Sequence, residues 1–208
     1  PSPGSEIDYW IDKHEVTNEQ FQEFVDADGY TEKKYWKHKF VEDDRQLNWE
    51  EAMARFKDKT GRHGPATWEA GTFHEGEGEY PVCGVSWYEA AAYAEFAGKN
   101  LPVVAVWREA ANQGMATYII PQSNFAEAPA AVGAHKGIGK FGLYDMAGNI
   151  KEWCWNATDV EGIQRYIMGG SWKDPDYMFL EEETKPPFDR DQAHGFRCAR
   201  YTGGIEAL

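Results

Sequence analysis

The chain has 208 residues, of which 42% are hydrophobic and 27% are charged, so it has material for a sizeable core and is not intrinsically disordered. Acidic residues outnumber basic ones by 35 to 21, which gives a formal net charge of −14. Such a charge repels polyanions and argues against nucleic acids and anionic membranes as partners. The length permits one large domain or two small ones.

Membrane and redox signals are weak. The long uncharged stretch that contains residues 114–126 is broken by Pro121, and no basic start is followed by an apolar block. The three cysteines, Cys83, Cys154 and Cys198, are too few to staple the fold and lack the spacing of a zinc site. Their odd number favours reduced, buried thiols, so we expect a cytoplasmic protein, with one disulfide and a free thiol as the alternative.

Capping boxes predict three helices in chain order. Each has a short polar residue followed three positions later by Gln or Glu: Thr17 with Gln20, Asn48 with Glu51, and Ser86 with Glu89. We therefore expect helices near 17–28, from 48 to just before 61, and near 86–97. A shorter helical stretch is expected near 106–111.

From residue 114 onward, short apolar pieces alternate with Gly, Pro, Asn and Asp, as in short strands joined by long loops. The expected strands are residues 118–120, 142–144, 152–155, 166–168 and 196–201. Helices that precede a set of short strands are typical of an α+β fold. We expect a single domain over 1–208, with its core at about 9–201.

Common catalytic motifs are not supported. The Gly-rich stretch 137–142 lacks the strand and helix that a phosphate-binding loop needs, so a turn is favoured. The six histidines are too far apart for a metal cluster. Cys83 and Cys198 lie in apolar surroundings, where inert thiols are more common than nucleophiles.

The segment 145–153 has two interpretations. Asp145, Asn149 and Glu152 surround a glycine turn, and oxygen ligands spaced along such a loop suit Ca²⁺. The alternative is a structural turn in which Asn149 is left-handed and Glu152 pairs with a buried arginine such as Arg197.

Four segments together resemble the formylglycine-generating-enzyme (sulfatase-modifying-factor) family. They read IDKHEVTN at 11–18, YPVCGVSWYEA at 80–90, GLYDMAGNIKEW at 142–153, and GGSW at 169–172 together with GFR at 195–197. The resemblance implies a C-type-lectin-like α+β domain with long loops. Residues 35–38 and 64–69 look closest to versions appended to bacterial serine/threonine kinases and related signalling proteins.

The resemblance also implies where the family's catalytic copper would bind. Two cysteines shortly after the Gly-Gly-Ser turn hold Cu(I) in the family, and their positions here are Asp174 and Phe179. Neither supplies the soft thiolate that Cu(I) needs, so no copper is expected. The related sulfoxide synthases carry an additional iron-binding domain, for which this chain has no room. We expect a non-catalytic protein, with an oxidoreductase of altered chemistry as the alternative.

Two further features come from the resemblance. A family calcium site matches Asp145, the backbone carbonyls of Gly148 and Ile150, and Glu152, so calcium is an expected ligand. The usual disulfide partner of Cys198 corresponds here to Ala94, which agrees with reduced thiols.

The remaining candidate is the segment 172–194, which in lectin-like folds is a ligand-binding surface and which some diversified bacterial and phage receptors vary. It combines aromatic residues, acids and prolines that stiffen a loop. A protein or small ligand is expected to bind here. The predicted binding residues are Trp172, Asp174, Tyr177, Phe179, Phe188 and Arg190. The alternative is that the aromatic side chains fold under and the acids are only a solvated face.

Overall fold

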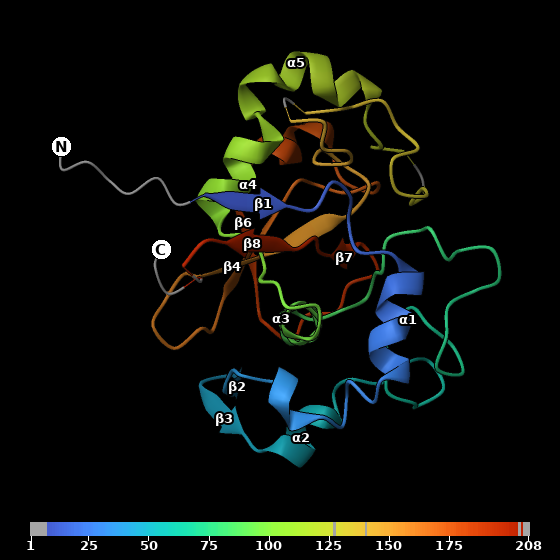
Figure 1. Cartoon of the computed structure of the whole chain (residues 1–208), viewed down its shortest axis with the longest axis vertical. Helices are drawn as coiled ribbons and strands as arrows, with labels where there is room; N and C mark the ends of the chain where they lie inside the picture. The colour runs from blue at the N-terminus through green and yellow to red at the C-terminus, as the bar shows by residue number, and fades with distance from the viewer. Residues whose placement is uncertain (1–7, 127, 140, 204, 206–208) are drawn as a thin grey trace.

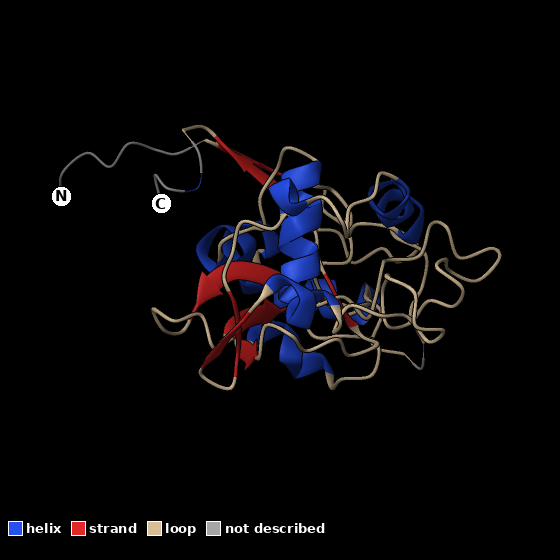
Figure 2. Ribbon diagram, turned by 90° about the horizontal axis from the view of Figure 1, so that it is seen from below, coloured by secondary structure: helices blue, strands red, loops and turns tan. Residues whose placement is uncertain are grey.

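The computed structural model describes residues 8–126, 128–139, 141–203 and 205, and it shows an α+β fold of few helices, short strands and long loops (Figures 1 and 2). The helices are α1 (Asn18–Asp26), α2 (Trp49–Met53), α3 (Trp87–Phe96), α4 (Val104–Ala111) and α5 (Ala116–Ile119), with 3₁₀ turns η1 (Lys33–Tyr35), η2 (Gln113–Met115), η3 (Ile120–Gln122) and η4 (Asp176–Leu180). The strands are β1 (Tyr9–Ile11), β2 (Phe40–Glu42), β3 (Arg45–Leu47), β4 (Lys151–Ala157), β5 (Arg165–Met168), β6 (Glu183–Lys185), β7 (His194–Gly195) and β8 (Ala199–Tyr201). The predicted fold class is confirmed.

All three capping boxes are present. The side chains of Thr17, Asn48 and Ser86 each accept the backbone N–H three residues later, and the side chain at that position accepts the cap N–H in return. The predicted length of the second helix is wrong, because α2 ends at Met53. Beyond it, the carbonyls of Arg55 and Lys57 accept hydrogen bonds from the Arg190 guanidinium instead of from the next helical turn.

Strand β4 is one of the two central strands of a four-stranded sheet with the order β6-β5-β4-β7. It pairs antiparallel with β5 and parallel with β7. The predicted strands 152–155 and 166–168 lie within β4 and β5, so both are confirmed. Strands β1 and β8, near the two ends of the chain, form a separate antiparallel ribbon.

Three strand predictions need correction. Residues 118–120 belong to α5 and η3, where local hydrogen bonds from the Gln122 and Ser123 side chains close the turns. Residues 142–144 form no strand. In 196–201 only the last three residues are a strand, because their partner β1 is itself only three residues long.

Helix α3 runs through the centre of the molecule and is seen end-on in Figure 1. Its first eight residues are all buried, which explains why the sequence there is nearly free of polar side chains. Two indoles fix it to the sheet: Trp87 Nε1 donates to the Cys154 carbonyl at 2.8 Å, and Trp153 Nε1 donates to the Val85 carbonyl at 2.9 Å. These two hydrogen bonds therefore hold the segment 80–90, which includes the start of α3, against β4.

The three cysteines are buried free thiols, as expected from their number. Among the described residues, no helix is long and apolar enough to span a bilayer.

Candidate ligand-binding site

The Gly-Gly-Ser turn after β5 places Ser171 inside the protein and Trp172 at its surface. Gly169 and Gly170 have φ values of 101° and 69°, a region that strains other residues. A Cβ atom on Gly169 would lie 3.1 Å from the Met146 carbonyl oxygen, so the turn also needs glycine for close packing. The geometry of this turn thus sets the position of the residues that follow it, including Asp174.

Asp174, at the first copper-cysteine position, belongs to a buried ion-pair network. Its carboxylate lies 3.3 Å from the ammonium of Lys151, whose side chain is only 7% exposed, and it also accepts the hydroxyl of Ser171. Lys151 pairs with Glu183 on β6 as well. Because a buried ammonium needs counter-charge, this carboxylate is committed to the protein itself. Sequence reasoning placed Asp174 at the ligand surface and did not identify Lys151.

Phe179, at the second copper-cysteine position, is fully buried and packs edge-on against Trp107 at 6.4 Å between ring centres. The prediction that Phe179 contributes to a binding surface is therefore wrong, because η4 turns its ring into the core. Its hydrocarbon ring offers no ligand atom to a metal. The residues at the two positions do not fit Cu(I).

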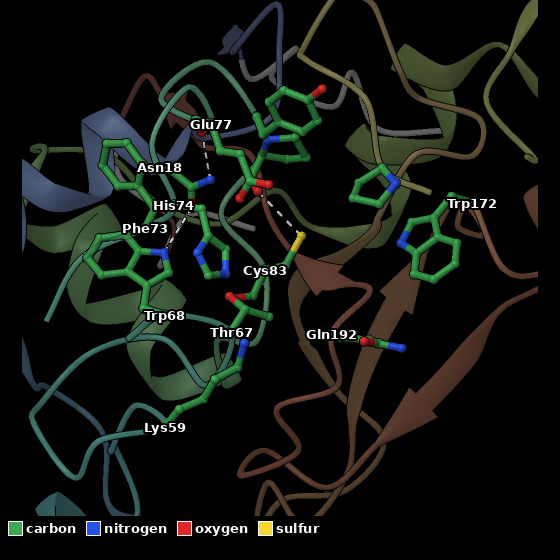
Figure 3. Close-up of a pocket in the computed structure, with 13 residues that line it drawn as sticks. Asn18, Lys59, Thr67, Trp68, Phe73, His74, Glu77, Cys83, Trp172 and Gln192 are labelled. Atoms are coloured by element: carbon green, nitrogen blue, oxygen red, sulfur yellow. Dashed lines mark hydrogen bonds between the residues drawn. The ribbon is translucent and has the colours of Figure 1, made fainter. Parts of the chain in front are cut away.

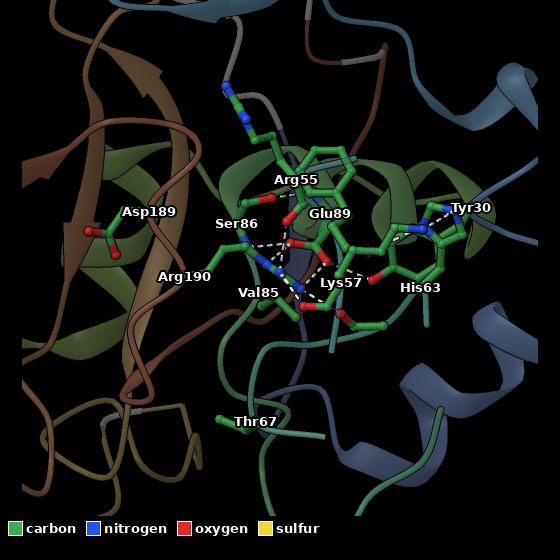
Figure 4. A network of polar contacts seen from close by, with 12 residues as sticks. Tyr30, Arg55, Lys57, His63, Thr67, Val85, Ser86, Glu89, Asp189 and Arg190 are labelled. Carbon is green, nitrogen blue, oxygen red and sulfur yellow. Dashed lines mark hydrogen bonds and ion pairs between the residues drawn. The ribbon is translucent and has the colours of Figure 1, made fainter. Parts of the chain in front are cut away.

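Phe188 and Arg190 also point inward, in agreement with the alternative interpretation of this segment. The Phe188 ring stacks on Phe56 at 5.6 Å and lies 4.8 Å from Tyr88. Arg190 is 11% exposed, and its guanidinium grips Glu89 with two hydrogen bonds of 2.9 Å (Figure 4). Both were predicted as ligand contacts, and their packing against distant segments corrects that prediction.

The Glu89 carboxylate accepts hydrogen bonds from three different parts of the chain. It accepts the Tyr30 hydroxyl at 2.6 Å and the Ser86 backbone N–H at 2.8 Å in addition to Arg190. Burial and the neighbouring Glu89 carboxylate raise the pKa of Tyr30 well above its usual value. Arg190 further donates to the Gly64 carbonyl, so the segment 55–64, helix α3 and the segment 186–190 are held together. The network is structural, since every donor that Arg190 offers is used.

Of the six predicted binding residues, Tyr177 alone is exposed. Tyr177 is 58% exposed, and Trp172 is half-buried and borders a pocket of about 210 Å³. Figure 3 shows Trp172 and Gln192 on one side of this pocket, facing Trp68, His74 and Cys83 on the other. The pocket is thus built by Trp172 and Gln192, by residues of the segment 59–83, and by Asn18 and Pro129. The sequence analysis did not select the segment 59–83 as a binding surface.

The Cys83 thiol in the pocket wall is not activated. It donates to the Pro81 carbonyl at 3.3 Å, and burial raises the pKa of the thiol, with the nearby Glu15 carboxylate adding to the effect. A protonated buried thiol is a poor nucleophile. The pocket is therefore suited to binding rather than to cysteine chemistry.

The predicted calcium residues lie beside a second buried pair. Glu152 accepts two hydrogen bonds of 2.7 Å from Arg197 and one of 2.8 Å from Trp107 Nε1, and both its side chain and that of Arg197 are fully buried. Asn149 is left-handed, with φ of 57°. These are the features of the structural-turn alternative. Because its oxygens already accept hydrogen bonds from the Arg197 guanidinium and the Trp107 indole, Glu152 does not fit a calcium ligand in this arrangement.

Asp145, the other predicted calcium carboxylate, is buried and accepts the Gly133 N–H at 2.6 Å. Burial raises its pKa. Across the described part of the chain, no three His, Cys, Asp or Glu side chains gather as a metal cluster. Calcium at Asp145, Gly148, Ile150 and Glu152 stays a prediction.

Glu15 is a buried acid that sequence reasoning missed. It is 1% exposed, and its carboxylate accepts the Asn149 side-chain amide at 2.9 Å. Burial, together with the charges of Asp145 and Glu152, raises the pKa of Glu15 well above its usual value. Its place in the segment 11–18 was part of the family resemblance, but nothing local in the sequence signals burial.

Comparisons with known proteins agree with this architecture. Residues 5–202 match the family model of the sulfatase-modifying factor enzyme 1-like domain. Over 92% of its length the chain is 30% identical to the serine/threonine-protein kinase pkn1 of Chlamydia pneumoniae, of which it spans only 33%. It is 29% identical to the formylglycine-generating enzyme of Thermomonospora curvata, covering 92% of this chain and 81% of that one.

Among solved structures, the crystal structure of CarF superposes with a TM-score of 0.64 and 20% identity, covering 93% of this chain and 86% of CarF. Identity at this level shows the fold alone. The chain spans about a third of the length of the kinase relatives that it matches.

Proposed function

Since the chain belongs to the sulfatase-modifying factor enzyme 1-like domain family yet has no thiol at either copper position, we propose that it is a non-catalytic binding module on this scaffold. The observation that carries the proposal is which residues occupy those two positions and what they contact. Asp174 is neutralised by Lys151, and Phe179 fills the core. Neither can hold the copper that oxidises a substrate cysteine in the family.

The binding site of this module is the pocket beside Trp172. Half-buried and exposed aromatic rings are common anchors in recognition surfaces, since they bury much apolar area with few rotors to fix. We further propose that the chain serves as the recognition domain of a larger bacterial signalling protein. The similarity to kinase pkn1, of which the chain spans one third, supports that setting.

Two measurements test the proposal. A sulfatase-type peptide incubated with the protein, Cu(I), reductant and oxygen should yield no aldehyde by mass spectrometry beyond a no-protein control. Aldehyde formation would instead establish the oxidoreductase of altered chemistry.

The second measurement is capture. Molecules from the source cell that are retained by the immobilised wild-type chain should be lost with Trp172→Ala and kept with Tyr118→Ala. Tyr118 is a suitable control because it is 67% exposed and lies on α5, outside this pocket. Equal retention by all three proteins would show that the Trp172 pocket is not the recognition site.

A further inference from the structure

A group of exposed apolar side chains lies around α5, at the end of the molecule opposite α2 and β3 (Figure 1). Eight large hydrophobic side chains are exposed among the described residues, and three of them, Met115, Tyr118 and Ile138, line one pocket of about 170 Å³. We call these three residues and their pocket the α5 face. Single exposed hydrophobic residues are common on monomeric proteins, whereas a group of them marks an interaction surface.

Two segments of the chain build the α5 face. The first is η2 with α5, in which Ile119 is the only side chain that α5 buries. The second is 136–139, which is held in place because the backbone N–H of Gly137 donates to the Gln122 carbonyl at 3.0 Å. The ring of Tyr118 is 67% exposed and belongs to no core cluster. The backbone beneath the face is therefore fixed, while the apolar side chains on it are available for contact.

The same part of the sequence is poor in charge. Between residues 112 and 141 there are one acidic residue, Glu127, and two basic residues, Lys136 and Lys140, although 27% of the whole chain is charged. The remainder of the chain therefore carries the whole acidic excess. Lys136 is the only charged residue that lines the pocket. Exposed Met and Tyr with few charges are the composition of the centre of a protein–protein interface.

The shape of the α5 face favours a second copy of the same chain as its occupant. The face combines an exposed ring, Tyr118, with a hollow beside it, so a two-fold axis sets each ring against the hollow of the other copy. A symmetric contact of this kind requires a surface that complements itself. The hollow is smaller than the ~300 Å³ at which sites for small molecules begin, so it accommodates a side chain.

Long-range charge agrees with this choice. Two chains of net charge −14 repel each other wherever their acidic surfaces meet. The α5 face brings the least like charge together, because no acidic residue lines it. A strongly basic partner is attracted instead to the acidic surface elsewhere, and a strongly acidic one is repelled by the chain as a whole.

We propose that the chain self-associates through the α5 face into a symmetric dimer, in which Tyr118 of each copy packs into the pocket of the other. Few apolar side chains per copy form the centre of this interface, so the dimer is weak and depends on concentration. The inference goes beyond the proposed recognition function, because the α5 face shares no lining residue with the Trp172 pocket.

Sedimentation equilibrium of the chain, from ~1 μM to ~1 mM, tests the dimer. The average mass should rise from the 23.6 kDa of one chain toward twice that value and no further. Raising the salt from ~0.15 M to ~0.5 M should strengthen association, because screening reduces the repulsion between the two acidic chains. A mass that stays monomeric up to ~1 mM would overturn the proposal and leave the face to a different apolar partner. Association that weakens with salt would also overturn it, since it would indicate an interface of paired charges.

Variants locate the interface. Tyr118→Ala should weaken self-association at least ~10-fold, since it removes the ring that fills the partner's pocket. Ile138→Lys, on the second segment, should have a similar effect because it places a charge at the centre of the contact. The matched control is Trp10→Ala, which removes a ring of similar exposure on β1, outside the α5 face. If Trp10→Ala weakens association as much as Tyr118→Ala does, or if Tyr118→Ala has no effect, the α5 face is not the interface.

The dimer and the recognition function fail separately. Tyr118→Ala leaves the Trp172 pocket intact, so it should lose self-association and keep the capture of cellular molecules. If the wild-type chain is monomeric while Trp172→Ala still loses capture, the dimer falls and the recognition function stands. If Tyr118→Ala abolishes the dimer while Trp172→Ala leaves capture unchanged, the dimer stands and the Trp172 pocket is not the recognition site.

Discussion

The interior ion pairs and the Trp172 pocket use acidic and basic side chains in opposite ways. Arg197 with Glu152, and Arg190 with Glu89, are buried pairs in which each guanidinium hydrogen-bonds both to a carboxylate and to backbone carbonyls. In the pocket, Lys59 and Glu77 have no such partners in the described chain. The contrast separates buried charges, which stabilise the interior, from less buried charges of the pocket, which are free to contact a ligand.

Removing one partner of a fully buried pair should have the largest effect. Arg197→Met leaves Glu152 charged and unpaired, so the free energy of unfolding should fall by about 3–5 kcal/mol. Urea denaturation measures the loss. The double variant Arg197→Met with Glu152→Gln should recover part of it, since no buried charge is then uncompensated. A loss below about 1 kcal/mol would mean that the pair is not buried in solution.

The second pair should rank next, because Arg190 retains some exposure. Arg190→Met should lower the free energy of unfolding by about 3 kcal/mol, since Glu89 loses its cation and the carbonyls of residues 55, 57 and 64 lose their donor. The matched control is Arg45→Met, which breaks an exposed pair with Glu51 and should cost at most ~1 kcal/mol. Equal losses would remove the distinction between interior and surface pairs.

Glu15 should make stability depend on pH. Its folded pKa is raised, so between the unfolded value near 4.5 and the higher folded value the native state holds a proton that the unfolded chain has released. Stability therefore falls as the pH rises through this window, by up to ~1.4 kcal/mol per pH unit. The stability of Glu15→Gln relative to wild type should increase from pH 5 to pH 8 in urea titrations. A constant difference would contradict the raised pKa.

Calcium removal should have the smallest effect. As Glu152 is engaged by Arg197 and Trp107, EDTA should change the melting temperature by less than about 2 °C. Differential scanning calorimetry with EDTA and with added calcium gives the measurement. A larger drop in EDTA that disappears in Asp145→Asn would instead establish the calcium site predicted from the family resemblance.

What the sequence predicted well was local. The three capping boxes depend on side chains only three residues apart, and each formed as predicted, whereas the end of α2 depends on Arg190, far along the chain. The strand predicted at 118–120 failed because its apolar residues also suit a short helix that buries only Ile119.

The candidate site shows the same division. Tyr177 is exposed and Trp172 is half-buried, whereas Phe188 and Arg190 turn inward toward Phe56 and Glu89, partners more than 100 residues away. The opposite pocket wall was missed because Lys59 and Glu77 match no motif, and Trp68 belongs to a segment noted only for its family resemblance; the three residues converge only through the fold.

The carboxylate of Glu89 has a consequence for the order of folding. The same side chain closes the capping box of α3 and receives Tyr30 and Arg190, which are 59 and 101 residues away in sequence. The first turn of α3 can therefore form early from local contacts, but Glu89 obtains its counter-charge only after the chain between it and Arg190, 101 residues away, has closed into a loop. Closure of such loops is slow, so docking of the segment around Arg190 is expected among the late events of folding, with Arg190→Met chiefly accelerating unfolding.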